Sequence, residues 1–381
     1  MTKNRHGMKF GKFALIVMML LSSASWGKRV DALYDARTLV QNQTLDVRKE
    51  AAKAGLTEVL VRLSGSELPE ENAAINSALE IADQYLYQFS YSKLESHEWS
   101  ESSPPGSSWL NMRFEGRALT RILRSAELPI WGAERPTMLV WLAVGTGGGE
   151  RLVITEGSDH PALHAIREAT RQRGVPLILP VYDLEDSMQL PSESLWGLFS
   201  DVIQTASQRY SPESVLAGRV YKTADGRWFG HWKFLFRGEE KSFVYHADSL
   251  DEHVLTGVSH SAEALANVFA IKPSQGRTDT VTLVIHGVDD LEQYARVSNY
   301  LQKLTTVKQV AITGLKKTDL SLELKLASQY HQFEQALKLD RKLEPQADAP
   351  IAKSTGDGSS NGTATAADST TSQVKHFRWR P

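Results

Sequence analysis

The sequence predicts a mixed α/β (α+β) fold, with two small α/β sandwich modules followed by a βαββα module and a disordered tail. Apolar residues recur every three or four positions in some segments and at every second position in others, which predicts helices and strands in alternation. Turns that contain glycine separate these segments. A chain of 381 residues is long enough for two or three domains.

Residues 1–27 are predicted to be a secretory signal peptide. Four Lys and Arg residues come first, an unbroken apolar run from Phe13 to Leu21 follows, and small residues lead up to Gly27. The apolar run is too short to cross a bilayer as a helix, which takes about 20 residues. We therefore expect export and cleavage near Ala24 or Gly27, with a retained, uncleaved anchor as the alternative.

Composition excludes several classes of site. The chain contains no cysteine, which rules out disulfides, thiol nucleophiles, thiolate zinc sites and iron–sulfur clusters. Removal of the leader, with its four basic residues, leaves 39 Lys and Arg against 45 Asp and Glu, a net charge of −6. A body of that charge does not predict a nucleic-acid partner.

The first module is assigned to residues 28–135. Ala51, Leu56 and Leu60 recur at helical spacing, and Ser64-Gly65 is a helix stop signal. The predicted order is strand, helix, helix, strand and helix, at residues 30–40, 46–63, 73–89, 109–114 and 117–126.

The middle module is assigned to residues 136–272 and contains several antiparallel strands. Its first strand is continuously apolar, which predicts burial on both faces. The following glycines predict a hairpin, because a phosphate-binding loop would lead into a helix and Glu150 stands where its last glycine belongs. Strands are predicted at residues 138–144, 151–155, 176–180, 215–222, 227–236 and 241–246, and helices at 160–173, 195–210 and 251–269.

The third module is assigned to residues 278–344. The predicted order is strand, helix, strand, strand and helix, at residues 281–287, 291–304, 307–315, 319–327 and 330–339. This order is most of a ferredoxin-like unit. By analogy of fold alone, such units more often bind partners than carry out chemistry.

Residues 345–381 are predicted to be a disordered tail. As far as about Gln373 they are mainly Ala, Ser, Thr, Gly and Asp, which cannot bury enough surface to offset the entropy of ordering. The tip at residues 375–380 is basic and aromatic and includes Trp379. It is either a ragged chain end or a short element that contacts an anionic membrane surface or a partner.

Several motifs carry a resemblance to a known family. They are Leu128-Pro129-Ile130-Trp131-Gly132, Arg135-Pro136, the apolar strand that follows, and Asp225-Gly226-Arg227-Trp228 with Trp232. Over residues 30–269 the chain resembles domain of unknown function 2066, a family of exported Gram-negative proteins. The resemblance implies a periplasmic location and gives no catalytic residue to transfer.

The candidate binding residues are aromatic or lie beside an aromatic residue. Trp131 and Arg135 are predicted to form either a rigid joint between modules or an elbow that binds a partner. Trp228 and Trp232 lie four apart on one predicted strand and therefore share a face, which is either core or an exposed strip for a peptide or glycan. Trp379 is the candidate in the tail.

No catalytic residue, metal site or cofactor is predicted. The His160/His164 pair lacks a third ligand, and Asp289-Asp290 is best explained as a helix cap. We expect a non-enzymatic interaction or assembly factor of the cell envelope with a protein partner. The alternative is a hydrolase or binding protein for peptidoglycan or another glycan polymer, with Asp183, Asp186 and His164 as its best catalytic candidates.

Overall fold

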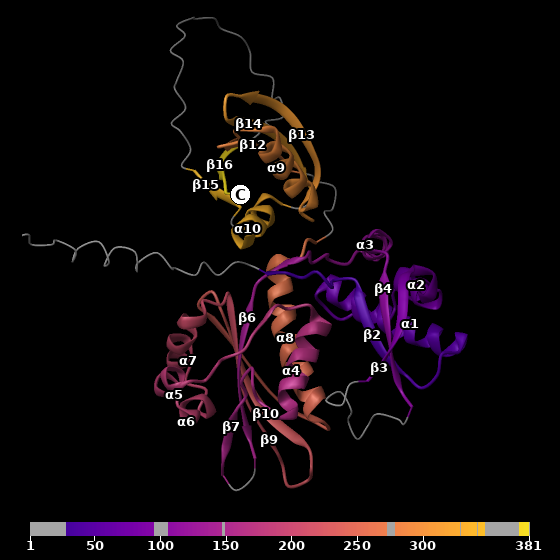
Figure 1. Cartoon of the computed structure of the whole chain (residues 1–381), viewed down its shortest axis with the longest axis vertical. Helices are drawn as coiled ribbons and strands as arrows, with labels where there is room; N and C mark the ends of the chain where they lie inside the picture. The colour runs from indigo at the N-terminus through magenta and orange to yellow at the C-terminus, as the bar shows by residue number, and fades with distance from the viewer. Residues whose placement is uncertain are drawn as a thin grey trace, which may run out of the picture.

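The computed structural model describes residues 28–94, 106–146, 149–272, 279–327, 329–340, 342–346 and 373–380. The predicted mixed α/β fold is confirmed, and each of the three larger sheets belongs to one module (Figure 1). The expected signal peptide and the tail at residues 347–372 lie outside the described residues. Within the described part of the chain, no helix has the length and apolar character needed to span a bilayer.

In the first module, helices pack on a three-stranded antiparallel sheet of order β2-β4-β3. The second helix of this module was predicted at residues 73–89, which is too long at its carboxyl end. It stops after α2 and a short 3-10 helix (Ala82–Tyr85), and Phe89 lies on an edge strand opposite Met112. Pairing with the neighbouring strand overrides the local helical pattern there. The elements are β2 (Asp35–Val40), α1 (Leu45–Ser64), α2 (Ala73–Glu80), β3 (Leu86–Lys93), β4 (Ser108–Phe114) and α3 (Gly116–Ser125).

In the middle module, two helical layers sandwich a six-stranded sheet of order β11-β10-β9-β6-β7, with β8 also beside β6. Helices α4 (Pro161–Arg173) and α8 (Leu250–Phe269) cover one face, and the short helices α5 to α7, between Leu184 and Ser207, cover the other (Figure 1). As predicted, the first strand of the module is buried on both faces. The strands are β6 (Met138–Gly145), β7 (Arg151–Val153), β8 (Leu177–Ile178), β9 (Ser214–Lys222), β10 (Trp228–Phe236) and β11 (Glu239–Ala247).

Two helical predictions in this module need correction. The single helix expected at residues 195–210 is broken, because Leu198 adopts a left-handed φ of 52° between two short helices. The segment after Asp183, for which no helix was predicted, forms a short helix that Asp183 caps. The helices are α4 (Pro161–Arg173), α5 (Leu184–Gln189), α6 (Ser192–Trp196), α7 (Ser200–Ser207) and α8 (Leu250–Phe269).

The third module has a five-stranded sheet of order β13-β14-β12-β16-β15. The first three strands and both helices follow the predicted ferredoxin-like order, and Asp290 caps α9 as expected. The elements are β12 (Thr280–His286), α9 (Leu291–Lys303), β13 (Val307–Lys316), β14 (Asp319–Leu326), α10 (Tyr330–Asp340), β15 (Leu343–Pro345) and β16 (Gln373–Trp379).

The prediction for the basic and aromatic tip is wrong. Residues 373–379 form β16, which lies between β12 and β15 and runs parallel to β12. Phe377 and Trp379 alternate inward and are buried in the core of the third module, whereas Arg378 faces solvent. This period of two is a strand signal whose partner lies about 90 residues earlier in the chain (His286 opposite Arg378), so local composition did not reveal it.

Candidate binding cleft

Residues 128–135 form a linker at which the three modules meet. Its main chain is bonded to the end of α1 through Trp131 N–H to Leu63 O at 2.6 Å. Ile130 and Ile271 exchange two hydrogen bonds of 2.9 Å, which tie the linker to the segment after α8. The two-residue strand β1 (Lys28–Arg29) pairs with β5 (Glu134–Arg135) at the other end of the linker. The linker is therefore fixed from three sides.

Arg135 lies inside this junction and stabilises it. Its guanidinium is fully buried and donates five hydrogen bonds of 2.8 to 3.1 Å to main-chain carbonyls. It also lies over the ring of Trp131, 4.1 Å from the centroid. Burial, and then the charges of Arg62 and Arg173, lower the pKa of Arg135 well below its ordinary value. The accepting carbonyls are those of Arg62, Trp131, Gly132, Arg173 and Gly174.

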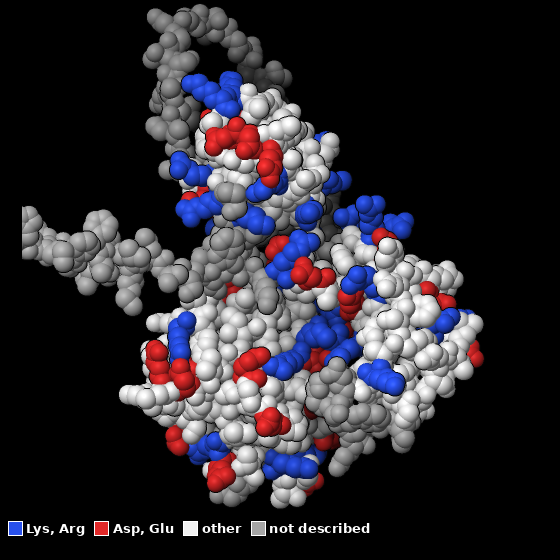
Figure 2. All heavy atoms as spheres, in the orientation of Figure 1, with Lys and Arg blue, Asp and Glu red and all other residues white. Residues whose placement is uncertain are grey.

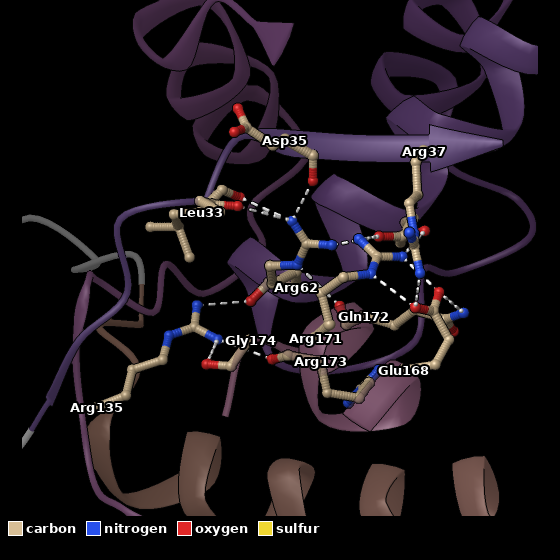
Figure 3. A network of polar contacts seen from close by, with 12 residues as sticks. Leu33, Asp35, Arg37, Arg62, Arg135, Glu168, Arg171, Gln172, Arg173 and Gly174 are labelled. Carbon is tan, nitrogen blue, oxygen red and sulfur yellow. Dashed lines mark hydrogen bonds and ion pairs between the residues drawn. The ribbon is translucent and has the colours of Figure 1, made fainter. Parts of the chain in front are cut away.

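The carboxyl ends of α1 and α4 converge on this arginine and cap each other (Figure 3). Arg62 of α1 donates from Nε to Gln172 O at the end of α4, and Arg173 of α4 donates to Gly65 O just after α1, at 2.9 and 3.0 Å. Carbonyls at a helix end lack partners within the helix and favour nearby cations. The arginines therefore satisfy carbonyl groups at the two helix ends and connect the first module to the middle one.

An acidic layer flanks these arginines. Glu58 accepts from Arg62 and Arg171, and Glu168 forms ion pairs with Arg171 at 2.7 Å and with Arg37 at 3.2 Å. Burial acts to raise the pKa of Glu168, but the hydrogen bonds and charge of Arg171, helped by Gln172 and Arg37, lower it to about 2. The network thus stabilises the module interface most strongly when its carboxylates are ionised.

The residues predicted to form a binding surface are mostly buried and do not come together. Trp131 and Arg135 form the rigid joint rather than an exposed elbow. Trp232 packs between the sheet and α8, where it donates to Nδ1 of the buried His253 at 3.2 Å. Trp379 lies in the third core, and Trp228 is half-buried beside the same core as Trp232. Because they are buried, none of these candidate residues except Trp228 belongs to the solvent-exposed surface.

A large cleft opens where the linker meets the third module. Its volume is about 730 Å³, within the roughly 300–1,000 Å³ typical of small-molecule pockets. The first module contributes residues from the segment before β2 and from α3, and the third module contributes the turn between α9 and β13. Its apolar lining includes Leu33, Leu63, Leu123, Leu128, Ile130, Phe269, Ile271, Leu304 and Leu339.

The lining of the cleft is strongly basic. It contains six Lys and Arg residues against two acidic residues, Asp31 and Glu134, whereas the whole chain has a net charge of −2. On the face shown in Figure 2, Lys and Arg side chains gather where the third module meets the other two. Among the described residues, five of the six have no ion pair and are exposed: Arg117, Arg124, Lys272, Lys303 and Lys308.

Two buried polar groups that line the cleft have no hydrogen-bond partner in the described part of the structure. They are Nε1 of Trp131, whose side chain is 1% exposed, and Oγ1 of Thr306, which is 2% exposed. A buried donor without a partner costs roughly 1–3 kcal/mol, so each such group calls for an explanation. A bound molecule whose acceptor oxygens reached these two buried atoms would satisfy both of them.

Two of the three candidate catalytic groups, Asp183 and Asp186, form structural contacts. Asp186 is buried and accepts hydrogen bonds from Tyr210 and Arg209, and a hydrogen bond from Arg209 lowers the pKa of Asp183. His160 accepts from Ala162 N–H as the cap of α4. Among the described residues, no group of three or more His, Asp or Glu side chains could hold a metal ion. Asp183 and Asp186 therefore have a structural role, because their contacts connect the start of α5 to the residues just after α7.

A second surface, missed in the sequence, lies on the opposite face of β10 from Trp228 and Trp232. Strand register places Tyr221, Phe229 and His246 in a row across three strands, with centroid separations of 5.4 and 4.7 Å. Trp196 extends the row 6.0 Å beyond Tyr221, and Arg151 lies over its ring. We call these four rings the aromatic row. None of them is fully buried.

Comparison with protein-family models gives one partial match. Residues 28–132, the first module with part of the linker, match the model described as Domain of unknown function (DUF8605). This corrects the resemblance inferred from the sequence: the chain carries a domain of unknown function, but the family that matches is not domain of unknown function 2066. No curated protein matches the chain.

Sequence reasoning could not have found the cleft. Its basic side chains come from the segment before β2, from α3, from the residues just after α8, from the end of α9 and from the start of β13, and each is an ordinary surface residue in its own segment. The motif around Trp131 did mark the linker, as either a rigid joint or a partner-binding elbow, but it gave no sign of the cavity beside it.

Proposed function

We propose that the protein is a non-enzymatic interaction or assembly factor of the Gram-negative cell envelope, exported to the periplasm, and that the cleft is where it binds its partner. The two unpartnered polar groups of Trp131 and Thr306 support this most directly, since both side chains line the cleft and neither group has a hydrogen-bond partner among the described residues. The leader sequence supports export. A binding role also fits the occupied state of Asp183 and Asp186.

The position of the cleft supports an assembly role. It is lined by all three modules, so a bound partner would contact each of them at once. Gly132 of the linker approaches Thr305 of the third module so closely that a Cβ atom there would lie 2.5 Å from Oγ1. Binding in the cleft would therefore be sensitive to how the third module is docked, and would in turn stabilise that docking.

Site-specific photo-crosslinking in living cells tests the proposal. A photoreactive residue replaces Gln302, which is exposed and lines the cleft, and a control carries it at Asp201, which is exposed on α7. We expect adducts in the periplasmic fraction from position 302 and not from position 201. Equal labelling at both positions, or a chain retained in the cytosol with Met1 intact, would contradict the proposal.

The alternative function, binding of an envelope polymer, rests on the aromatic row. Sugar rings stack their apolar faces on aromatic side chains, and the three registered rings offer a platform across neighbouring strands. Insoluble peptidoglycan should then retain the native chain and lose the Phe229→Ala variant, whereas Tyr87→Ala, an exposed ring of the first module, should change nothing. Equal retention of both variants removes this alternative.

A further inference from the structure

We infer that the occupant of the cleft is a single anionic amphiphile, an acyl chain that carries a phosphate headgroup, as in an anionic phospholipid. This inference rests on the proposed function and specifies its ligand. It follows from three properties of the same cavity, namely its apolar lining, its basic rim and its two unpartnered buried groups.

The apolar lining favours an acyl chain. Leucine and isoleucine side chains, together with Phe269 and Trp131, make up most of the apolar part of the lining and come from all three modules. An acyl chain gains about 0.8 kcal/mol for each buried CH₂ group and has no polar atoms to satisfy. A free phosphate or a sugar could not use this surface.

The basic rim favours a negatively charged headgroup. Arg117 and Arg124 lie seven residues apart on α3, and Lys303 and Lys308 lie across the cleft on the third module. None of these four forms an ion pair with a described residue, so none must give up a partner to bind a phosphate. Arginine also matches the geometry of phosphate oxygens through paired donors.

The two buried groups favour an ester-linked amphiphile over a simple detergent-like anion. The indole N–H of Trp131 can only donate a hydrogen bond, and the hydroxyl of Thr306 can donate one. Both side chains are buried, whereas the four cations of the rim are exposed. A ligand with acceptor oxygens between its charged head and its chain, such as an acyl ester carbonyl, satisfies this order of charge, acceptor and hydrocarbon.

The test uses the full exported chain and monomeric lysophosphatidylglycerol, with binding followed by isothermal titration calorimetry. Three comparison ligands separate the contributions: lysophosphatidylcholine lacks net charge, glycerol phosphate lacks the chain, and an acidic peptide represents a protein partner. We expect lysophosphatidylglycerol to bind at least tenfold more tightly than any of them. Equal or tighter binding of lysophosphatidylcholine, of glycerol phosphate or of the peptide would overturn the assignment of an anionic lipid.

Matched variants locate the binding. Arg117→Gln/Arg124→Gln should weaken lysophosphatidylglycerol binding about tenfold, since two exposed charges contribute a few-fold each. Arg121→Gln removes the same charge from the same helix outside the cleft and should change the affinity less than twofold. Thr306→Val should weaken binding about fivefold, the effect of one hydrogen bond, without lowering the thermal unfolding midpoint. Equal effects of Arg121→Gln and of the double variant would overturn the inference.

Failure of this inference is distinguishable from failure of the proposed function. Photo-adducts from position 302 that contain only protein, together with no lipid binding, would overturn the lipid ligand and leave the interaction role intact. Absence of both adducts and lipid binding would remove both.

Discussion

Replacement of Arg135 by lysine tests how the modules are joined. Arg135 is fully buried and donates five hydrogen bonds to carbonyls at the ends of α1 and α4 and in the linker. Lysine has at most three donors, so at least two of those carbonyls lose their partner. A hydrogen bond from a charged donor contributes roughly 1.5–3 kcal/mol, so the free energy of unfolding should fall by about 3–6 kcal/mol.

A loss of that size is a large share of the stability of an ordinary domain, which is roughly 5–15 kcal/mol. Urea unfolding followed by tryptophan fluorescence measures it, because Trp131 stacks on the replaced side chain. Amide hydrogen exchange shows where the loss falls, and we expect faster exchange at Gly65, Gly174 and Trp131, whose N–H groups lie at the two helix ends and in the linker.

Arg121→Lys is the matched control for this variant. Arg121 is exposed on α3, and its replacement should change stability by less than about 0.5 kcal/mol. An Arg135→Lys variant within 1 kcal/mol of the native chain would refute the account, because the five hydrogen bonds would then contribute no more than surface contacts.

Three further predictions concern the module interfaces and the tail strand. Glu168→Gln should destabilise the chain by up to about 3 kcal/mol at pH 7 and progressively less as the pH falls from about 4.5 to 2. The reason is that folding lowers the pKa of Glu168 to about 2, so the stabilisation by the ionised carboxylate is lost as the pH falls from the ordinary pKa of a glutamate to this lowered pKa. Urea unfolding at pH 7 and pH 3 measures the difference, and a pH-independent difference would contradict the prediction. Gly132→Ala should cost about 1–3 kcal/mol through its clash with Thr305, and the additional change Thr305→Ala should restore most of the loss of thermal stability; no restoration would mean that the clash is not the cause. Trp379→Ala should cost about 3–5 kcal/mol and speed amide exchange in β12, since this ring is 7% exposed and packs 5.7 Å from Tyr300; unchanged exchange there would show that β16 does not complete the sheet.

Local patterns predicted the elements that local forces decide. Gly65 and Gly174 end helices α1 and α4 in the left-handed conformation that glycine favours, with φ of 78° and 64°. The hairpins of the middle module follow from alternation and from turn residues such as Asp225-Gly226. These signals lie within a few residues of the structure they determine, so one sequence suffices to find them.

Elements decided by distant partners escaped the sequence analysis. Phe89 continues a helical pattern but pairs with a strand more than 20 residues later, and Phe377 pairs with a strand about 90 residues earlier. The burial of Arg135 was equally hidden, because its partners are main-chain carbonyls that every sequence contains. The cleft depends on how three modules dock, and no short segment encodes that arrangement.

The most direct test of the central claim, that the cleft receives a ligand at its two unpartnered groups, is the indole N–H resonance of Trp131 in a nitrogen–proton NMR spectrum. The resonance is assigned with Trp131→Phe and followed during titration with lysophosphatidylglycerol. We predict a saturable downfield shift of the Trp131 indole proton, as expected for a new hydrogen bond, with the Trp228 indole unchanged. A titration that leaves the Trp131 indole proton in place, or that shifts both indoles alike, would contradict the claim.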